Sequence, residues 1–128
     1  MTATRKRKVK TPDYDTLRKM EPEDGFQRAV FDLARATGWL IFHDNDPRKN
    51  TRGLPDALMV RPPRVIFAEF KTELDERAPR RGSTRFEQFV WLAALAQCPG
   101  VETYLWRPSS WRQIERVLVA AHETEQAA

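Results

Sequence analysis

Two adjacent prolines, Pro62 and Pro63, stand between two apolar runs and limit the ways in which this chain can fold. The first run, residues 57–60, reads ALMV, and the second, residues 65–72, reads VIFAEFKT. Two consecutive prolines cannot supply the N–H groups that a central strand needs, so the chain turns at this point. We therefore predict two strands that pair as a hairpin.

Charged residues fall at the open end of this predicted hairpin. Glu69 and Lys71 are two residues apart, and because strand side chains alternate between faces, both project from the same face. Asp56 stands immediately before the first strand. In a hairpin the start of one strand lies beside the end of the other, so we expect Asp56 to lie next to Glu69 and Lys71.

This combination of residue types is typical of metal-assisted hydrolysis. Two neighbouring carboxylates repel each other unless a cation lies between them or one of them is protonated. Oxygen ligands suit Mg²⁺ or Mn²⁺, with Asp56, Glu69 and the backbone carbonyl of Phe70 as the predicted ligands. Lys71 either orients or helps to deprotonate a water molecule, or offsets charge on a phosphorane-like transition state. The alternative interpretation is an ordinary surface acid beside a Glu–Lys pair at a strand edge.

The remaining pattern predicts an α/β domain in the order α-β-β-β-α-β-α around a mixed sheet. Phe26, Val30 and Leu33 recur at helical spacing, and Gly38 fits the end of that helix. An apolar run at 39–43 predicts a buried strand. The other expected elements are strands at 57–60 and 65–72, a helix at 85–97, a strand at 101–107 and a helix at 109–122.

The charge of the chain is unevenly spread. Of the 128 residues, the first ten hold five Lys or Arg and no acid, so the rest sum to −1 against a net charge of +4. A basic arm of this kind suits nucleic acid, although a solvated tail has the same composition. We expect a disordered arm at 1–20, one domain at 21–122 and a frayed tail at 123–128.

Two features that the sequence lacks indicate the cellular compartment and the kind of partner. Cys98 is the single cysteine, so no intrachain disulfide can form, and a reducing cytoplasm is the natural compartment. No run approaches the roughly 20 apolar residues of a membrane span. We expect no membrane partner.

The spaced motifs also carry a family resemblance. Asp56, Glu69 and Lys71 resemble the signature of the PD-(D/E)xK nuclease superfamily. The chain is similar in more detail to the VRR-NUC family, the virus-type replication-repair nucleases, in its G-x-PD turn at 53–56 and in Thr72 after the ExK motif. The resemblance covers about residues 21–118, and its departure is a loop at 73–83 that is unusually rich in charge.

The resemblance implies a restriction-endonuclease-like core and a Mg²⁺- or Mn²⁺-dependent nuclease acting on DNA. Asp56 and Glu69 would be metal ligands and Lys71 the catalytic lysine. Gln88, in the helix after the charged loop, matches the family's glutamine, and Glu23 matches its first-helix glutamate. Glu21 and Asp24 are alternatives to Glu23.

Stand-alone members resemble bacterial and phage junction-resolving homodimers, which implies structure-selective cutting of branched DNA in a bacterial cell or a phage-infected host. Two rival interpretations remain. One is a catalytically silent DNA-binding module on the same fold, and the other is an adaptor whose acids are surface charges.

Basic residues flank the predicted site in the sequence and are candidates for gripping DNA phosphates. Solvated loops would have the same composition, and a histidine at a strand end is more often structural. The predicted DNA-binding residues are Arg48, Lys49, Arg52, Arg80, Arg81, Arg85 and His43.

Overall fold

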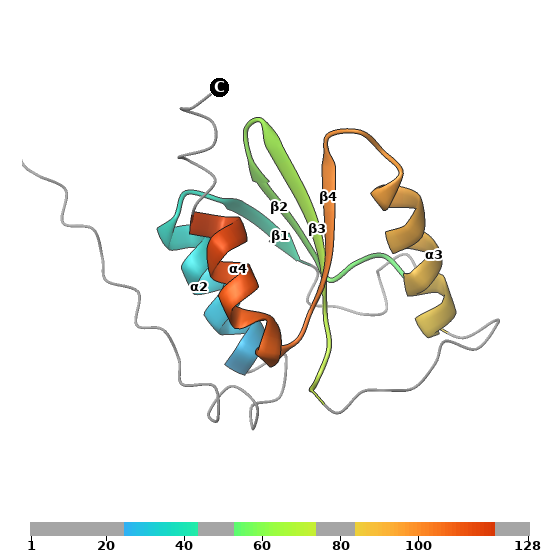
Figure 1. The fold of residues 1–128 in the computed structure, drawn as a ribbon, viewed down its shortest axis with the longest axis horizontal. Coiled ribbons are helices and arrows are strands. Elements are labelled where there is room, and N and C mark those ends of the chain that lie inside the picture. The colour runs from blue at the N-terminus through green and yellow to red at the C-terminus, as the bar shows by residue number, and fades with distance from the viewer. Residues whose placement is uncertain (1–24, 44–52, 74–83, 120–128) are drawn as a thin grey trace, which may run out of the picture.

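The computed structural model describes residues 25–43, 53–73 and 84–119. Within these ranges the elements follow the predicted order, with a short 3₁₀ helix before the last α-helix (Figure 1). The elements are α2 (Gln27–Ala36), β1 (Leu40–His43), β2 (Ala57–Arg61), β3 (Arg64–Phe70), α3 (Thr84–Ala96), β4 (Val101–Trp106), η2 (Pro108–Ser110) and α4 (Trp111–Val119).

The four strands form one mixed sheet in the order β1-β2-β3-β4. The β1–β2 and β2–β3 pairs are antiparallel, whereas β3 and β4 are parallel. The predicted hairpin is confirmed, because Arg61 pairs with Arg64 across the Pro62–Pro63 turn. The parallel β3–β4 pair needs a crossover connection, and α3 lies within it.

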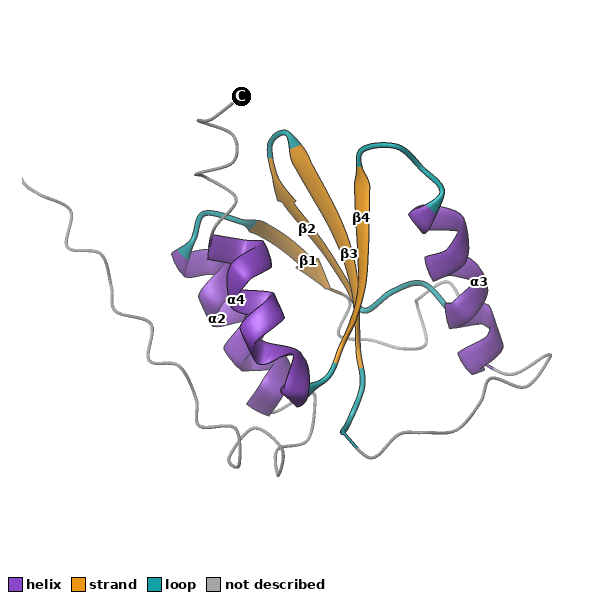
Figure 2. Cartoon of the chain, viewed as in Figure 1, coloured by secondary structure: helices purple, strands orange, loops and turns teal. Residues whose placement is uncertain are grey.

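Helices cover both faces of the sheet. Figure 1 shows α2 and α4 side by side on one face and α3 on the other, and Figure 2 gives the same arrangement by secondary structure. The core lies between the sheet and the α2/α4 layer, where Met59, Ile66 and Trp106 are fully buried. No described side chain of α3 is fully buried, so this helix packs on the sheet less tightly than α2 and α4.

The helical stripe predicted for α2 is confirmed. Phe26, Val30 and Leu33 are all buried, and the helix ends at Thr37, whose hydroxyl donates to the Leu33 carbonyl oxygen at 2.8 Å. Gly38 follows with a φ of +92°, a left-handed conformation that glycine adopts without steric cost.

The strand predicted at 39–43 is present as β1, but the prediction that it is buried is wrong. Trp39 is buried but precedes the strand, and within β1 the side chains of Leu40 and Phe42 are 72% and 61% exposed. β1 is an edge strand, and only its other face, carrying Ile41, packs against the core. An apolar run cannot distinguish a strand covered on both faces from one covered on a single face.

Within the described parts of the chain, no helix has the length and apolar character needed to cross a membrane.

Candidate active site

The open end of the hairpin holds two carboxylates, each of which accepts a hydrogen bond from a backbone amide of the facing segment. Ala57 pairs with Ala68, so Asp56 and Glu69 lie opposite each other at the next position. The Asp56 amide donates to Glu69 Oε2 at 3.2 Å, and the Phe70 amide donates to Asp56 Oδ2 at 2.8 Å. The predicted meeting of Asp56 and Glu69 across the hairpin is therefore confirmed. These bonds take one oxygen of each carboxylate.

Glu69 is an acid inside the protein. Its side chain is 2% exposed, although it belongs to a strand that otherwise buries apolar residues. Burial raises the pKa of Glu69 most, the neighbouring charge of Asp56 raises it further, and Lys71 lowers it in part, which leaves the pKa at about 8. Close to neutral pH, this carboxylate is in an environment that disfavours its negative charge.

Lys71 brings positive charge to the same place. Its backbone amide donates to the Trp106 carbonyl oxygen at 3.0 Å, which continues the β3–β4 ladder beyond Phe70. Its Nζ lies 3.6 Å from Glu69 Oε1 and donates to Gln88 Oε1 at 2.7 Å. The ammonium group is thereby held between an acid of β3 and an amide from the first turns of α3.

The donor set fits a hard divalent cation. Asp56 and Glu69 offer carboxylate oxygens, which Mg²⁺ and Mn²⁺ prefer, and Lys71 only partly offsets the cost of burying the Glu69 charge beside Asp56, so a cation here would be stabilising. Among the described residues no three His, Cys, Asp or Glu side chains gather around one point. A cation here would therefore need further oxygens, such as the Phe70 carbonyl or an acid outside the described residues.

Glu23, Glu21 and Asp24 lie outside the described residues. Phe26, just before α2, contacts the Phe70 ring edge-on with 5.8 Å between the ring centroids, on the face of the sheet opposite Glu69 and Lys71. The beginning of α2 and the end of β3 thus belong to the same end of the molecule.

Of the predicted DNA-binding residues, only His43 and Arg85 lie in the described ranges. The His43 ring packs on Phe31 at 4.8 Å, on the α2 face of the sheet and away from the face that carries Glu69 and Lys71. Arg85 is half-buried in the first turn of α3. The others, Arg48, Lys49, Arg52, Arg80 and Arg81, lie outside the described residues.

Sequence reasoning missed Arg107, which follows β4. Its Nη1 donates to the Thr72 carbonyl oxygen at 3.0 Å, and the nearby Ser109 amide donates to Glu73 Oε2 at 3.0 Å. Both bonds hold the segment that leaves Lys71. The available signal was topological: parallel strands end at the same sheet edge, so a residue just after β4 lies near the residues just after β3.

No family model, no curated protein and no solved structure matches this chain.

Proposed function

We propose that this protein is a divalent-metal-dependent endonuclease that hydrolyses DNA phosphodiester bonds. The single observation that carries the proposal is the buried Glu69 carboxylate held against Asp56, with the Lys71 ammonium beside it. An acid buried beside another acid costs folding free energy, and a bound cation removes much of that cost. An ordinary surface charge would be solvated instead.

The proposed fold is the restriction-endonuclease-like core that the VRR-NUC resemblance implies. The mixed four-stranded sheet and the element order support it, as does the position of the acids at one sheet end. The G-x-PD turn and the ExK strand meet across the hairpin, as a shared site requires.

In the proposed reaction, Asp56 and Glu69 would hold Mg²⁺ or Mn²⁺, with the Phe70 carbonyl and Glu23 as further ligands or supports. When bound, such a cation activates water and neutralises phosphate oxygens. Lys71 donates hydrogen bonds toward the charge that develops on the phosphate, and Gln88 orients its ammonium. Asp56 is anchored by the Phe70 amide, so little reorganisation is needed as charge develops.

The proposed partners are branched DNA and a second copy of the chain, in the cytoplasm of a bacterial cell or a phage-infected host. The basic first ten residues support a polyanionic partner. Exposed apolar side chains support self-association, because Phe89 and Val90 of α3 are 59% and 44% exposed and β1 exposes two more. A dimer has two sites, one for each strand of a junction.

The test is cleavage of labelled four-way junction, flap, single-stranded and linear duplex DNA, each with Mg²⁺, Mn²⁺ or EDTA. We expect metal-dependent cutting that favours branched DNA and is lost in Lys71→Ala. Binding without cleavage would support the silent DNA-binding module instead. A Lys71→Ala variant that cuts as well as the wild type would show that the activity lies elsewhere.

A further inference from the structure

Gly53 makes an unusually close contact with α3. It is buried, and its φ is +86°. A Cβ atom added here would lie 2.5 Å from both the carbonyl carbon and the Cβ of Glu87, and 2.8 Å from the Gln88 amide nitrogen. These separations are shorter than van der Waals contact allows, so glycine alone lets the two segments approach this closely.

The atoms that oppose such a Cβ cannot move aside independently. Two of the three belong to the backbone of α3, so relieving the clash requires a shift of the helix or of the 53–56 turn. The turn is fixed, because Asp56 is bonded to the end of β3 through two hydrogen bonds. α3 has no fully buried described side chain, so the helix is the part that yields.

Movement of α3 would reach Lys71 directly. Gln88 is one of the residues that touch Gly53, and its side-chain oxygen accepts the 2.7 Å hydrogen bond from Lys71 Nζ. One contact therefore links the turn that carries Asp56 to the amide that holds the ammonium group.

We propose that Gly53 is a positioning residue: its missing side chain sets the depth of α3 and so places Gln88 on Lys71. The catalytic part of this inference rests on the proposed nuclease function. Its structural part, the dependence of the Lys71–Gln88 hydrogen bond on Gly53, can be tested without any activity.

Gly100 provides a matched control. Its φ of +83° is almost the same, but a Cβ added there meets no atom within 4 Å. Gly53→Ala and Gly100→Ala therefore both place alanine at a left-handed φ, and only the first adds the clash with α3. Asparagine tolerates left-handed backbone better than alanine, so Gly53→Asn and Gly100→Asn form a second, gentler pair.

The first readout is the ¹⁵N-ammonium signal of Lys71 in metal-free protein, assigned by its loss in Lys71→Arg. A hydrogen-bonded ammonium exchanges slowly with water, so we expect the signal in the wild type and in both Gly100 variants. We expect it to be lost in the Gly53 variants and in Gln88→Met. A Gly53 variant that keeps the signal overturns the inference.

The second readout is cleavage. We expect Gly53→Ala to lower kcat about ten- to a hundredfold with little change in KM for DNA, because small displacements at a reacting centre are costly. If Gly53 acts through Gln88, the double variant Gly53→Ala/Gln88→Met is no slower than the slower single variant. Effects that multiply would show that Gly53 acts by another route, and overturn the inference.

Two further results keep the inference separate from the proposed function and from protein folding. If the wild type cuts no DNA, the nuclease proposal fails while the ammonium signals still decide whether Gly53 positions Gln88. If neither Gly53 variant folds, nuclear Overhauser effects between the Gly53 Hα protons and the Gln88 amide proton test the contact in the wild type. Their absence would overturn the inference.

Discussion

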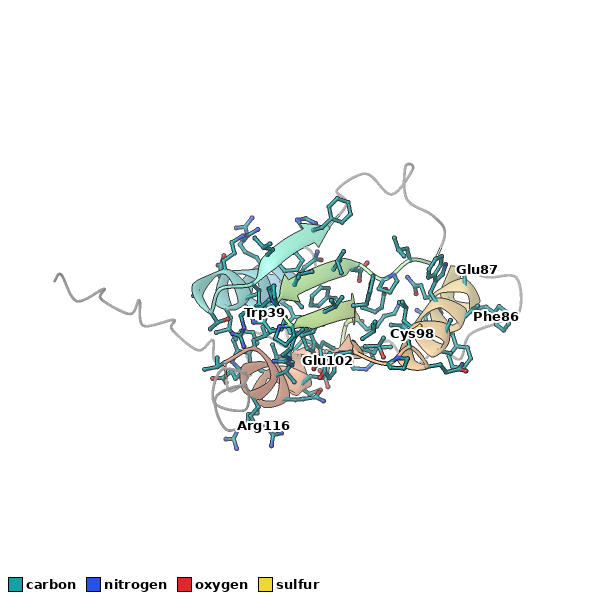
Figure 3. The ribbon with its side chains drawn as sticks, turned by 90° about the horizontal axis from the view of Figure 1, so that it is seen from above. Trp39, Phe86, Glu87, Cys98, Glu102 and Arg116 are labelled. Atoms are coloured by element: carbon teal, nitrogen blue, oxygen red, sulfur yellow. The ribbon has the colours of Figure 1, made fainter. Side chains whose placement is uncertain are left out.

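The two ends of the β2–β3 hairpin both place charged groups against the protein interior, and they do so in opposite ways. At the turn end, the guanidinium groups of Arg61 and Arg64 lie over the Trp39 ring, 4.7 and 5.1 Å from its centre (Figure 3 labels Trp39). Arg61 Nη1 also donates to the Thr37 and Leu118 carbonyl oxygens. These contacts tie the turn to the ends of α2 and α4.

Arg64 also forms a two-point pair with the carboxylate of Glu102, through Nε at 2.7 Å and Nη2 at 2.5 Å. Burial by itself raises the pKa of Glu102, but hydrogen bonds from Arg64 and Tyr104 more than offset it and hold the pKa below its ordinary value. The carboxylate of Glu102 is thus satisfied by its neighbours.

At the open end, Glu69 faces another acid, and its pKa is raised to about 8. Lys71 offsets this only in part, since its ammonium lies 3.6 Å away and is shared with Gln88. A carboxylate whose surroundings favour its negative charge stabilises the folded protein. One whose surroundings oppose it is typical of a functional site.

The largest expected effect is on DNA cleavage, which should depend on Glu69 but not on Glu102. Glu69→Gln keeps the size of the side chain but removes a proposed metal ligand, so we expect cleavage to fall by about 10³-fold or more. Glu102→Gln is the matched control at the turn end, and it should cut DNA at nearly the wild-type rate. Steady-state cleavage of one junction substrate in Mn²⁺ measures both. Equal losses of cleavage rate in the two variants would show that the open end and the turn end of the hairpin do not differ in function.

Glu69 should make the folded protein less stable as the pH rises. Folding raises the pKa of this acid from an ordinary 4.5 to about 8, so the folded state binds its proton more tightly than the unfolded chain. Its contribution to the free energy of unfolding is therefore fully present below pH 4.5 and is lost as pH rises through 8. The loss should be on the order of 3–5 kcal/mol, at about 1.4 kcal/mol per pKa unit.

Denaturant unfolding of metal-free protein between pH 5 and 9 measures this slope. Glu69→Gln has no proton to lose at this position, so its stability should vary less with pH and exceed that of the wild type near pH 9. Saturating Mn²⁺ should also reduce the slope, because a cation favours the ionised acid. A wild type that grows more stable from pH 5 to 8 without metal would contradict the shift.

A smaller and opposite effect is expected at the turn end. Glu102→Gln removes the charge that Arg64 and Tyr104 bond, and should lower the free energy of unfolding at pH 7 by about 1–3 kcal/mol. The same denaturant curves measure it. An increase in stability at pH 7 would mean that both acids are strained and that the two ends of the hairpin do not differ.

The sequence was sufficient to predict those parts of the fold and site that local rules determine. The Pro62–Pro63 turn and the alternation of strand side chains led to the hairpin, and the hairpin alone brings Asp56 to Glu69. Gln88 could not be placed in this way, because it lies in α3, a helix that packs on the sheet and is not part of the hairpin. It was expected from the family resemblance, and the structure brings its amide to Lys71.

Features that depend on packing between distant segments escaped prediction. The exposure of Leu40 and Phe42 follows from the position of β1 at the sheet edge, which an apolar run does not encode. Likewise, nothing near Arg107 in the sequence indicates that it bonds the Thr72 carbonyl. The contact of Gly53 with Glu87 and Gln88 joins residues more than thirty positions apart.

We propose that Asp56 and Glu69, at the open end of the hairpin, form a metal site. Anomalous diffraction from crystals soaked in Mn²⁺ tests it most directly. We expect a manganese peak within about 2.0–2.6 Å of carboxylate oxygens of both Asp56 and Glu69. No peak at this position, at a Mn²⁺ concentration that supports cleavage, would contradict it.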